Sequence, residues 1–332
     1  MTTEARAVLF HRTGDPDVLT IERVRLDDPG PGEVRIRVDA LGLNRAEALF
    51  RAGRYYYQPT LPASRLGYEA AGVVESVGAG VTEFAPGDPV LTGPQIEMSA
   101  QGVYGDRIVL PVESVIPRPA SVDAVTGAAT WLTYATAYGG LVETGGLRPG
   151  EHVVITAASS GVGTAAIQVA ARTGAVPIAV TRSGDKRRRL RDVGAAHVIV
   201  ASEVDVPEEV RRLTGGRGAE LIFDPVAGPE LPALAEAASV AGTIVLYGWL
   251  GGQPMLMPLN WPLTIHGYAN GHLSATVSGR RRINRYIEAG LRDGGLRPVV
   301  GKVFTGLERI VDAHRLMESN THVGKIVVTV EH

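Results

Sequence analysis

The chain has 332 residues, of which 45% are hydrophobic and 20% charged, and its formal net charge is −2. This length suits two domains, and the hydrophobic fraction excludes a disordered chain. A net charge this close to zero argues against a protein built chiefly to bind nucleic acid or an anionic membrane. The absence of cysteine excludes disulfides, thiolate nucleophiles and cysteine-ligated zinc.

The start of the chain carries no targeting signal that we recognise, because residues 1–6 lack the apolar core of a signal peptide. No run approaches the roughly 20 apolar residues that a membrane span requires. We therefore expect a soluble, cytoplasmic protein that acts on a small molecule and binds neither nucleic acid nor a membrane.

The first 120 or so residues consist of short strands and turns. Runs rich in β-branched residues lie at 7–10, 34–38 and 70–77, and turns rich in proline and glycine lie at 28–32 and 85–89. This pattern predicts a small, mainly-β domain with few helices.

From about residue 125 onwards, strands alternate with helices. The expected strands are 153–156, 176–180, 197–200, 220–223 and 242–247, and the expected helices are 164–172, 185–193, 207–213 and 230–239. Strands that alternate with helices of about ten residues indicate βαβ units and a doubly wound parallel sheet. The chain is expected to close with a strand at 324–330.

A glycine-containing turn at 157–163 links the first of these strands to the first of these helices. Gly161 and Gly163 permit a close backbone approach to pyrophosphate and tight packing of the helix on the sheet. Ser159 and Ser160 can donate hydroxyl groups, and the helix N-terminus favours bound phosphate. A strand–helix turn without a ligand is the alternative, but the following βα series favours a dinucleotide site.

The end of the next strand indicates which dinucleotide is bound. An acidic residue about 20 positions past the turn would bind the ribose 2′-hydroxyl of NAD. Here Thr181 and Arg182 end the strand and Lys186 follows, which suits a 2′-phosphate. We therefore predict NADPH rather than NADH, and interpret the basic run 186–191 as a solvated helix face.

Further motifs lie at 67–78, 86–90, 136–138, 147–151, 224–228 and 324–327. Together with the glycine turn they resemble the medium-chain dehydrogenase/reductase superfamily, in its zinc-independent quinone-oxidoreductase branch of zeta-crystallin-like proteins. The resemblance implies an α/β protein with a discontinuous GroES-like, mainly-β catalytic domain at 1–123 and 267–332. A doubly wound Rossmann domain that binds NADP(H), at 124–266, would be inserted into it.

The resemblance also bears on metal binding. Zinc-dependent relatives use a cysteine and the histidine of a Gly-His-Glu motif, and Asn44 and Tyr68 stand at these two positions. A Tyr–Asn pair is not a tetrahedral zinc site, and the eight histidines show no ligand spacing. We therefore expect no zinc, which favours hydride transfer to an acceptor that is already electron-poor, such as a quinone or an α,β-unsaturated carbonyl compound.

The resemblance suggests which side chains line the reaction. Asn44 lies in the segment that reaches the nicotinamide and its ribose, and is a catalytic candidate together with Tyr55. Tyr55 would either donate a proton or form a pocket wall. Tyr56 and Tyr57 would extend an aromatic face for a flat substrate, or lie on a solvent-facing loop. Tyr68 and Trp249 are expected in the substrate pocket.

Cofactor contacts are expected at the glycine turn, at the carboxyl ends of the parallel strands and beside the nicotinamide. The candidates are Asn44, Thr136, Ser159, Ser160, Gly161, Val162, Thr181, Arg182, Lys186, Val226, Tyr247 and Gly248.

An apolar run bracketed by prolines, at 254–259, bears on assembly. The resemblance implies that this segment pairs with a second copy across a two-fold axis, giving a homodimer. A simple core strand is the alternative.

These observations lead to the hypothesis of an NADPH-dependent, metal-free reductase of quinones or α,β-unsaturated carbonyl compounds. An enoyl-thioester reductase is one alternative. A non-catalytic NADPH-binding protein with a structural or regulatory role is another, since this chemistry requires no diagnostic catalytic residue.

Overall fold

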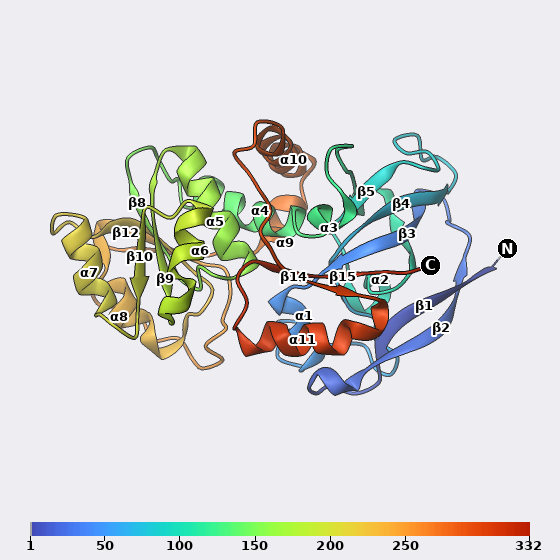
Figure 1. The fold of residues 1–332 in the computed structure, drawn as a ribbon, viewed down its shortest axis with the longest axis horizontal. Coiled ribbons are helices and arrows are strands. Elements are labelled where there is room, and N and C mark those ends of the chain that lie inside the picture. The colour runs from blue at the N-terminus through green and yellow to red at the C-terminus, as the bar shows by residue number, and fades with distance from the viewer. Residues whose placement is uncertain (1) are drawn as a thin grey trace. The chain divides into compact units, whose positions relative to one another are not determined.

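The structure is a computed structural model that describes residues 2–332. Its contacts divide the chain into two units (Figure 1). Unit 1 comprises the residues up to Leu132 together with Val300–His332, and unit 2 comprises Thr133–Val299. Both divisions fall later in the chain than the expected positions, 123/124 and 266/267.

The later first division follows from α3 (Ala124–Gly127), which packs on the sheet of unit 1. The later second division follows from α9 (Asn270–Ser274) and α10 (Val277–Arg292), which belong to unit 2. Arg282 on α10 binds Glu143 through two hydrogen bonds of 2.8 and 2.9 Å.

Unit 1 is mainly β, as predicted. Its strands are β1 (Thr2–Phe10), β2 (Leu19–Asp27), β3 (Glu33–Gly42), β4 (Glu69–Val77), β5 (Pro89–Thr92), β6 (Arg107–Pro111), β7 (Val115–Pro117), β14 (Val300–Thr305) and β15 (Lys325–Thr329). Seven of them form a sheet with the order β14-β15-β3-β4-β5-β7, in which β6 also pairs with β3, while β1 and β2 form an antiparallel pair.

The central strand β3 shows why these residues form a sheet. Val34, Ile36 and Val38 point into the core, while Arg35 and Arg37 alternate with them on the more exposed face. This alternation fixes the register, because a shift by one residue would expose the apolar side chains.

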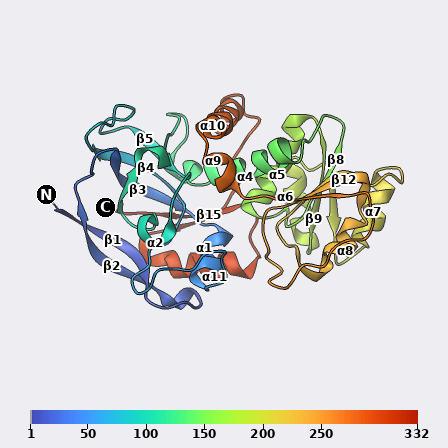
Figure 2. The ribbon, with the colours of Figure 1, turned by 180° about the vertical axis from the view of Figure 1, so that it is seen from behind.

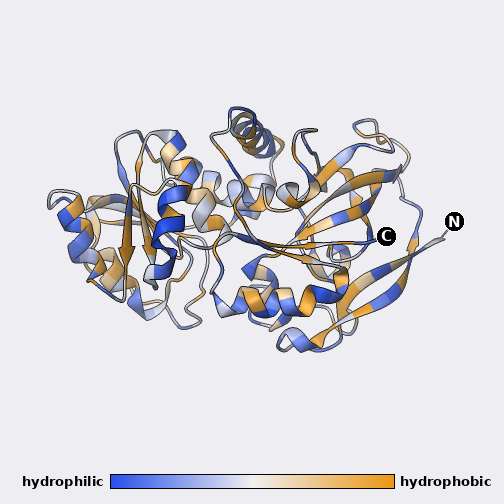
Figure 3. Ribbon diagram, viewed as in Figure 1, coloured by the Kyte–Doolittle hydropathy of each residue, from blue (hydrophilic) through white to orange (hydrophobic). Residues whose placement is uncertain are grey.

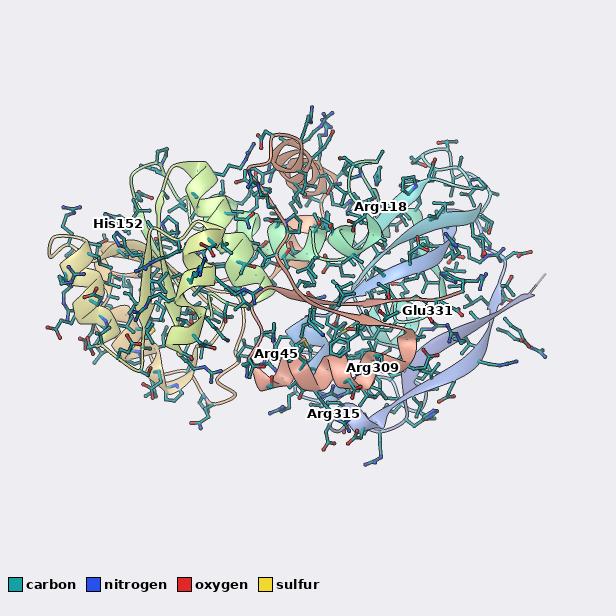
Figure 4. All side chains as sticks on the ribbon, in the orientation of Figure 1. Arg45, Arg118, His152, Arg309, Arg315 and Glu331 are labelled. Carbon is teal, nitrogen blue, oxygen red and sulfur yellow. The ribbon has the colours of Figure 1, made fainter. Side chains whose placement is uncertain are left out.

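Helices cover unit 1 at α1 (Arg45–Arg51), α2 (Met98–Gln101) and α11 (Ile310–Ser319). Figures 1 and 2 both show α1 beside α11. The buried Arg51 of α1 joins the two helices, since it donates to Glu318 at 2.7 Å and contacts His314 at 2.8 Å. In Figure 4, Arg309 and Arg315 mark the exposed side of α11, where Arg309 pairs with Asp312 at 2.8 Å.

Unit 2 contains the predicted doubly wound sheet. Its strands are β8 (His152–Ile155), β9 (Val176–Thr181), β10 (His197–Val200), β11 (Ala219–Asp224), β12 (Ala238–Leu246) and β13 (Thr264–Gly267). They are all parallel, in the order β10-β9-β8-β11-β12-β13. The chain moves outward from β8 in both directions, so the topological switch point lies between β8 and β11.

The helices of unit 2 form two groups around this sheet. One group is α5 (Gly161–Thr173) and α6 (Arg187–Val193), and the other is α7 (Val206–Leu213) and α8 (Leu231–Ala235). A further helix, α4 (Trp131–Tyr138), contains the division between the units. Figures 1 and 2 show the strands between the pair α5 and α6 and the pair α7 and α8. The strands are coloured as hydrophobic along most of their length in Figure 3, as expected for a sheet covered on both faces.

The expected helix at 230–239 is wrong at its C-terminal end. The helix ends at Ala235, and β12 begins at Ala238, which is paired with Ala219 of β11. The alanine-rich sequence favours a helix locally, but pairing with the neighbouring strand outweighs that preference. Among residues 2–332, no helix is long and apolar enough to cross a membrane.

Candidate functional site

Four tyrosines gather in unit 1 between α1 and β4. The Tyr57 and Tyr68 hydroxyls lie 2.8 Å apart, and the Tyr68 hydroxyl donates to that of Tyr55 at 3.4 Å. The ring of Tyr56 lies 4.4 Å from that of Tyr55 and is 71% exposed. The structure thus brings together all four tyrosines singled out from the sequence.

Burial acts on the hydroxyl groups of this cluster. Burial raises the pKa of Tyr55 and that of Tyr68 well above the usual value. Phe50 lies beneath the cluster, with its ring 5.1 Å from that of Tyr57 and 6.3 Å from that of Tyr55. The cluster therefore offers an apolar, aromatic surface with neutral hydroxyl groups.

Glu47 organises the segment behind these tyrosines. Its buried carboxylate accepts hydrogen bonds from the backbone N–H of Asn44 at 2.6 Å and of Tyr68 at 3.0 Å. It also accepts from the Asn44 side chain at 3.0 Å and from the Tyr104 hydroxyl at 2.6 Å. Burial raises its pKa, while these hydrogen bonds oppose the shift. The sequence contained a usable signal, because an asparagine followed three residues later by a glutamate is typical of a capping box.

A buried lysine occupies the same region. Lys325 is 3% exposed, and its ammonium lies 2.5 Å from the fully buried Glu69 carboxylate. It also donates to the Asn44 side-chain oxygen, while the Asn44 amide nitrogen donates to the Gly42 carbonyl at 3.2 Å. The second oxygen of Glu69 accepts from the Leu132 N–H at 2.9 Å. The amide group of Asn44 is thereby fixed, and its role as a catalytic and cofactor-binding residue remains a prediction.

The glycine turn of unit 2 has the geometry expected of a phosphate site. Ser160 caps α5 by accepting from the Gly163 N–H at 3.0 Å. A Cβ atom at Gly163 would lie 2.5 Å from the Ala157 carbonyl oxygen, so this position requires glycine. Gly161 and Val162 form the first turn of α5, whose N-terminal N–H groups and dipole favour an anion.

Lys186 lies beside this turn, and its role in selecting a 2′-phosphate remains a prediction. Its ammonium donates to the Ser159 hydroxyl oxygen at 3.2 Å, although 27 residues separate the two in sequence. Burial lowers the pKa of Lys186, which is only 9% exposed. Thr181 is buried at the end of β9, and Arg182 next to it is exposed.

Asp224 ties together the two strands at the switch point, a role that the sequence did not reveal. The Thr156 hydroxyl, just after β8, donates to the Asp224 carboxylate at the end of β11. The same carboxylate accepts from the backbone N–H of Val226 at 3.1 Å and of Ala227 at 2.6 Å. Ala227 is held at φ 52° and ψ −143°, a backbone conformation that favours glycine.

The remaining predicted residues lie in unit 2. Tyr247 follows β12, and its ring stacks on Phe223 with centroids 4.0 Å apart. A Cβ atom at Gly248 would lie 2.8 Å from the Pro225 carbonyl oxygen, so the chain needs glycine there. Thr136 lies on α4, partly buried, and Trp249 is 39% exposed.

No three histidine, aspartate or glutamate side chains within residues 2–332 are grouped so as to hold a metal ion. The described residues offer a strand–helix turn suited to an anion, with a neighbouring lysine, and an aromatic surface of tyrosines.

Comparison with known proteins identifies the family. Residues 30–120 match the model of the alcohol dehydrogenase GroES-like domain, and residues 161–291 match that of zinc-binding dehydrogenases. The chain is 31% identical to a 2-haloacrylate reductase from a Burkholderia species, over 97% of this chain and 98% of that protein.

Two solved structures have the same fold. The crystal structure of Escherichia coli quinone oxidoreductase complexed with NADPH superposes with a TM-score of 0.91 at 26% identity, covering 98% of this chain and all of the other (100%). A structure described as an NAD-dependent alcohol dehydrogenase superposes with a TM-score of 0.86 at 34% identity, with coverage of 98% and 100%.

The chain belongs to the medium-chain dehydrogenase/reductase superfamily, in the branch that contains the quinone oxidoreductases. This confirms the resemblance found in the sequence, together with the GroES-like and Rossmann-type architecture. The protein is accordingly an oxidoreductase of this superfamily.

Proposed function

We propose that the protein is an NADPH-dependent, metal-free reductase that reduces a quinone or an α,β-unsaturated carbonyl compound. The observation that carries the proposal is the contact of Lys186 with Ser159, which places a cation beside the glycine turn. A 2′-phosphate needs a cation at this end of the sheet, whereas the ribose hydroxyl of NAD needs an acid.

The residues of unit 2 fit the cofactor. Ser160, Gly161 and Val162 would hold the pyrophosphate at the start of α5, and Lys186 would contact the 2′-phosphate. When bound, NADPH supplies a hydride. Asp224 would keep the loop after β11 in place, since it accepts hydrogen bonds from two N–H groups of that loop.

The residues of unit 1 do not fit a catalytic zinc ion. Asn44, which replaces the first cysteine of zinc-dependent relatives, already accepts a hydrogen bond from the Lys325 ammonium. That positive charge would repel a zinc ion bound nearby. Tyr68 stands in place of the histidine. It is a neutral phenol whose hydroxyl group is hydrogen-bonded to another tyrosine.

The tyrosine cluster supports the choice of acceptor. Aromatic rings at 4.4 to 5.1 Å from one another suit a flat, conjugated molecule. Quinones and enones carry their own carbonyl group, which accepts the developing negative charge without a metal. The acrylate that gives one relative its name, 2-haloacrylate reductase, is an alkene conjugated to a carboxylate.

We also propose that the protein forms a homodimer through unit 2. The apolar segment 254–261 is not the edge strand; that position belongs to β13. Its side chains are exposed, including Leu256 at 55%, Leu259 at 82% and Trp261 at 67%. A second copy would cover these exposed apolar side chains.

Cofactor titration tests the first step of the proposal. Replacing Lys186 with alanine should raise the Kd for NADPH by about 10- to 100-fold, because a charge-assisted contact is lost, and leave the Kd for NADH nearly unchanged. Arg189→Ala, on the exposed side of α6, is the control with the same change of charge. Equal affinity of the wild type for NADH and NADPH would contradict the assignment.

A further inference from the structure

The side-chain amide of Asn44 is held by three partners. Its oxygen accepts a hydrogen bond of 2.5 Å from the Lys325 ammonium. Its nitrogen donates to the Gly42 carbonyl at 3.2 Å and to the Glu47 carboxylate at 3.0 Å. Both N–H groups of the amide are therefore in use, and a further partner can be bound only through the oxygen, as a hydrogen-bond acceptor.

These partners permit a single orientation of the amide. If the group were turned over, its NH₂ end would face the Lys325 ammonium, which is itself only a donor. Its oxygen would then face the Glu47 carboxylate and the Gly42 carbonyl, which both accept hydrogen bonds here. The capping box also turns the oxygen toward the Glu47 N–H, although that N–H makes its hydrogen bond of 3.1 Å with the Asn44 backbone carbonyl.

Lys325 is itself fixed in place. It lies on β15, which pairs with β3, so the pairing of these two strands brings it to the residues that follow β3. Its ammonium forms an ion pair of 2.5 Å with the fully buried Glu69 carboxylate, and its side chain is only 3% exposed. With so little water to compete, the ammonium holds its hydrogen-bond partner more firmly than an exposed lysine would.

The buried ion pair calls for a role other than stability. A buried lysine and glutamate contribute little net stability compared with apolar side chains of the same volume. Glu69 is fully buried, whereas Asn44, the other partner of the ammonium, is partly exposed. The effect of the ion pair therefore reaches a bound molecule through Asn44.

We infer that Lys325 is a positioning residue, whose ammonium sets the Asn44 amide so that its oxygen accepts a hydrogen bond from a sugar hydroxyl of the bound cofactor. This inference rests on the proposed function and on the predicted cofactor contact of Asn44, and it adds the residue that sets the direction of that contact. Asn44 touches the cofactor, and Lys325 acts through Asn44.

The same orientation assigns Asn44 to the cofactor and not to the acceptor. Polarising the carbonyl oxygen of a quinone or an enone requires a donor, and both N–H groups of the amide are already engaged. The group that Asn44 binds must bring its own proton, as a ribose hydroxyl does. NADPH carries such hydroxyls on the ribose of its nicotinamide half.

Cofactor titration of a variant without the ion pair tests this inference. Lys325→Met/Glu69→Gln removes both charges, so neither is left buried and unpaired, and it frees the Asn44 amide. We expect its Kd for NADPH to rise by about 3- to 10-fold, as for the loss of one hydrogen bond. Adenosine 2′,5′-bisphosphate carries the 2′-phosphate without the nicotinamide half, so its Kd should stay within about twofold of the wild-type value.

A second substitution shows whether Lys325 acts through Asn44. In Asn44→Ser, the serine can still cap the start of α1 but has no amide oxygen. This variant should raise the Kd for NADPH by a similar factor, and combining it with Lys325→Met/Glu69→Gln should raise it no further, because one contact is lost in each. Arg35→Met/Glu75→Gln, which removes an ion pair of 3.0 Å between β3 and β4, is the control for the loss of two opposite charges.

The single variants provide the test if the double variant does not fold. Lys325→Met frees the Asn44 amide, whereas Glu69→Gln keeps the ammonium and its hydrogen bond to Asn44. Both lose the ion pair, so a difference between them reports on Asn44 alone. Lys325→Met should therefore raise the Kd for NADPH more than Glu69→Gln does, and equal values would contradict the inference.

Three further results would overturn the inference and leave the proposed function intact. One is a wild-type Kd for NADPH in Lys325→Met/Glu69→Gln. Another is an equal loss of affinity for NADPH and for adenosine 2′,5′-bisphosphate. The third is a higher KM for a quinone in Asn44→Ser with an unchanged Kd for NADPH, since Asn44 would then contact the acceptor. If the wild type does not bind NADPH, or oxidises it with neither a quinone nor an enone, the proposed function itself fails.

Discussion

Replacing Lys325 with methionine removes the ammonium that lies 2.5 Å from the Glu69 carboxylate. Methionine fills nearly the same volume, so the main consequence is electrostatic. Glu69 is fully buried and would keep the hydrogen bond from the Leu132 N–H but lose its counter-charge. An unpaired buried charge of this kind costs about 3–5 kcal/mol, a large share of the roughly 5–15 kcal/mol by which a folded protein is stable.

Urea unfolding followed by tryptophan fluorescence measures this cost, because Trp131 in unit 1 is 1% exposed and would enter water on unfolding. Glu69→Gln alone should be destabilising by a similar amount, since it leaves the buried ammonium without a counter-charge, although the hydrogen bond to Asn44 remains. The double variant Lys325→Met/Glu69→Gln should lie within about 2 kcal/mol of wild type, because neither charge remains. A loss below about 1 kcal/mol in Lys325→Met, or a double variant worse than both singles, would refute this reasoning.

Three further predictions follow from other residues. Burial and the nearby Arg51 lower the pKa of His314 to about 3, so the unfolded chain binds a proton more readily below pH 6.5. The free energy of unfolding should therefore fall by about 2 kcal/mol between pH 6.5 and pH 5. Urea unfolding of His314→Asn should show a smaller fall over the same pH range. An equal fall in both proteins would contradict this explanation. Asp224→Ala should weaken NADPH and NADH binding alike in cofactor titrations, because it frees the loop after β11, and a loss confined to NADPH would be inconsistent with that role. Leu259→Asp should convert the proposed dimer into a monomer in light scattering, and a monomeric wild type would exclude the dimer.

Much of the fold could be predicted because periodicity and turn residues act locally. The βα series of unit 2 has short apolar strands and amphipathic helices, and their order alone defines a doubly wound sheet. The helix expected at 230–239 failed at its end because Ala238 pairs with a strand 19 residues earlier in the chain. Such long-range pairing leaves no local signal.

The site was predicted unevenly for the same reason. Ser159 was expected at the pyrophosphate turn and Lys186 at the 2′-phosphate, and their contact could not be predicted because 27 residues separate them in sequence. The partners of Asn44 were not expected, because Lys325 is far away in sequence and reaches it only through the pairing of β15 with β3. Asp224 was noted only as part of a motif, since its three hydrogen bonds depend on the position of the neighbouring strand and loop.

The central claim is tested most directly by following NADPH oxidation with a benzoquinone, an o-quinone, an enone and an enoyl-CoA, with NADH in parallel. We predict turnover of a quinone or the enone with NADPH, and much slower turnover with NADH. Preference for the enoyl-CoA would instead indicate an enoyl-thioester reductase. Tight NADPH binding without oxidation by any acceptor would contradict the account and favour a non-catalytic binding protein.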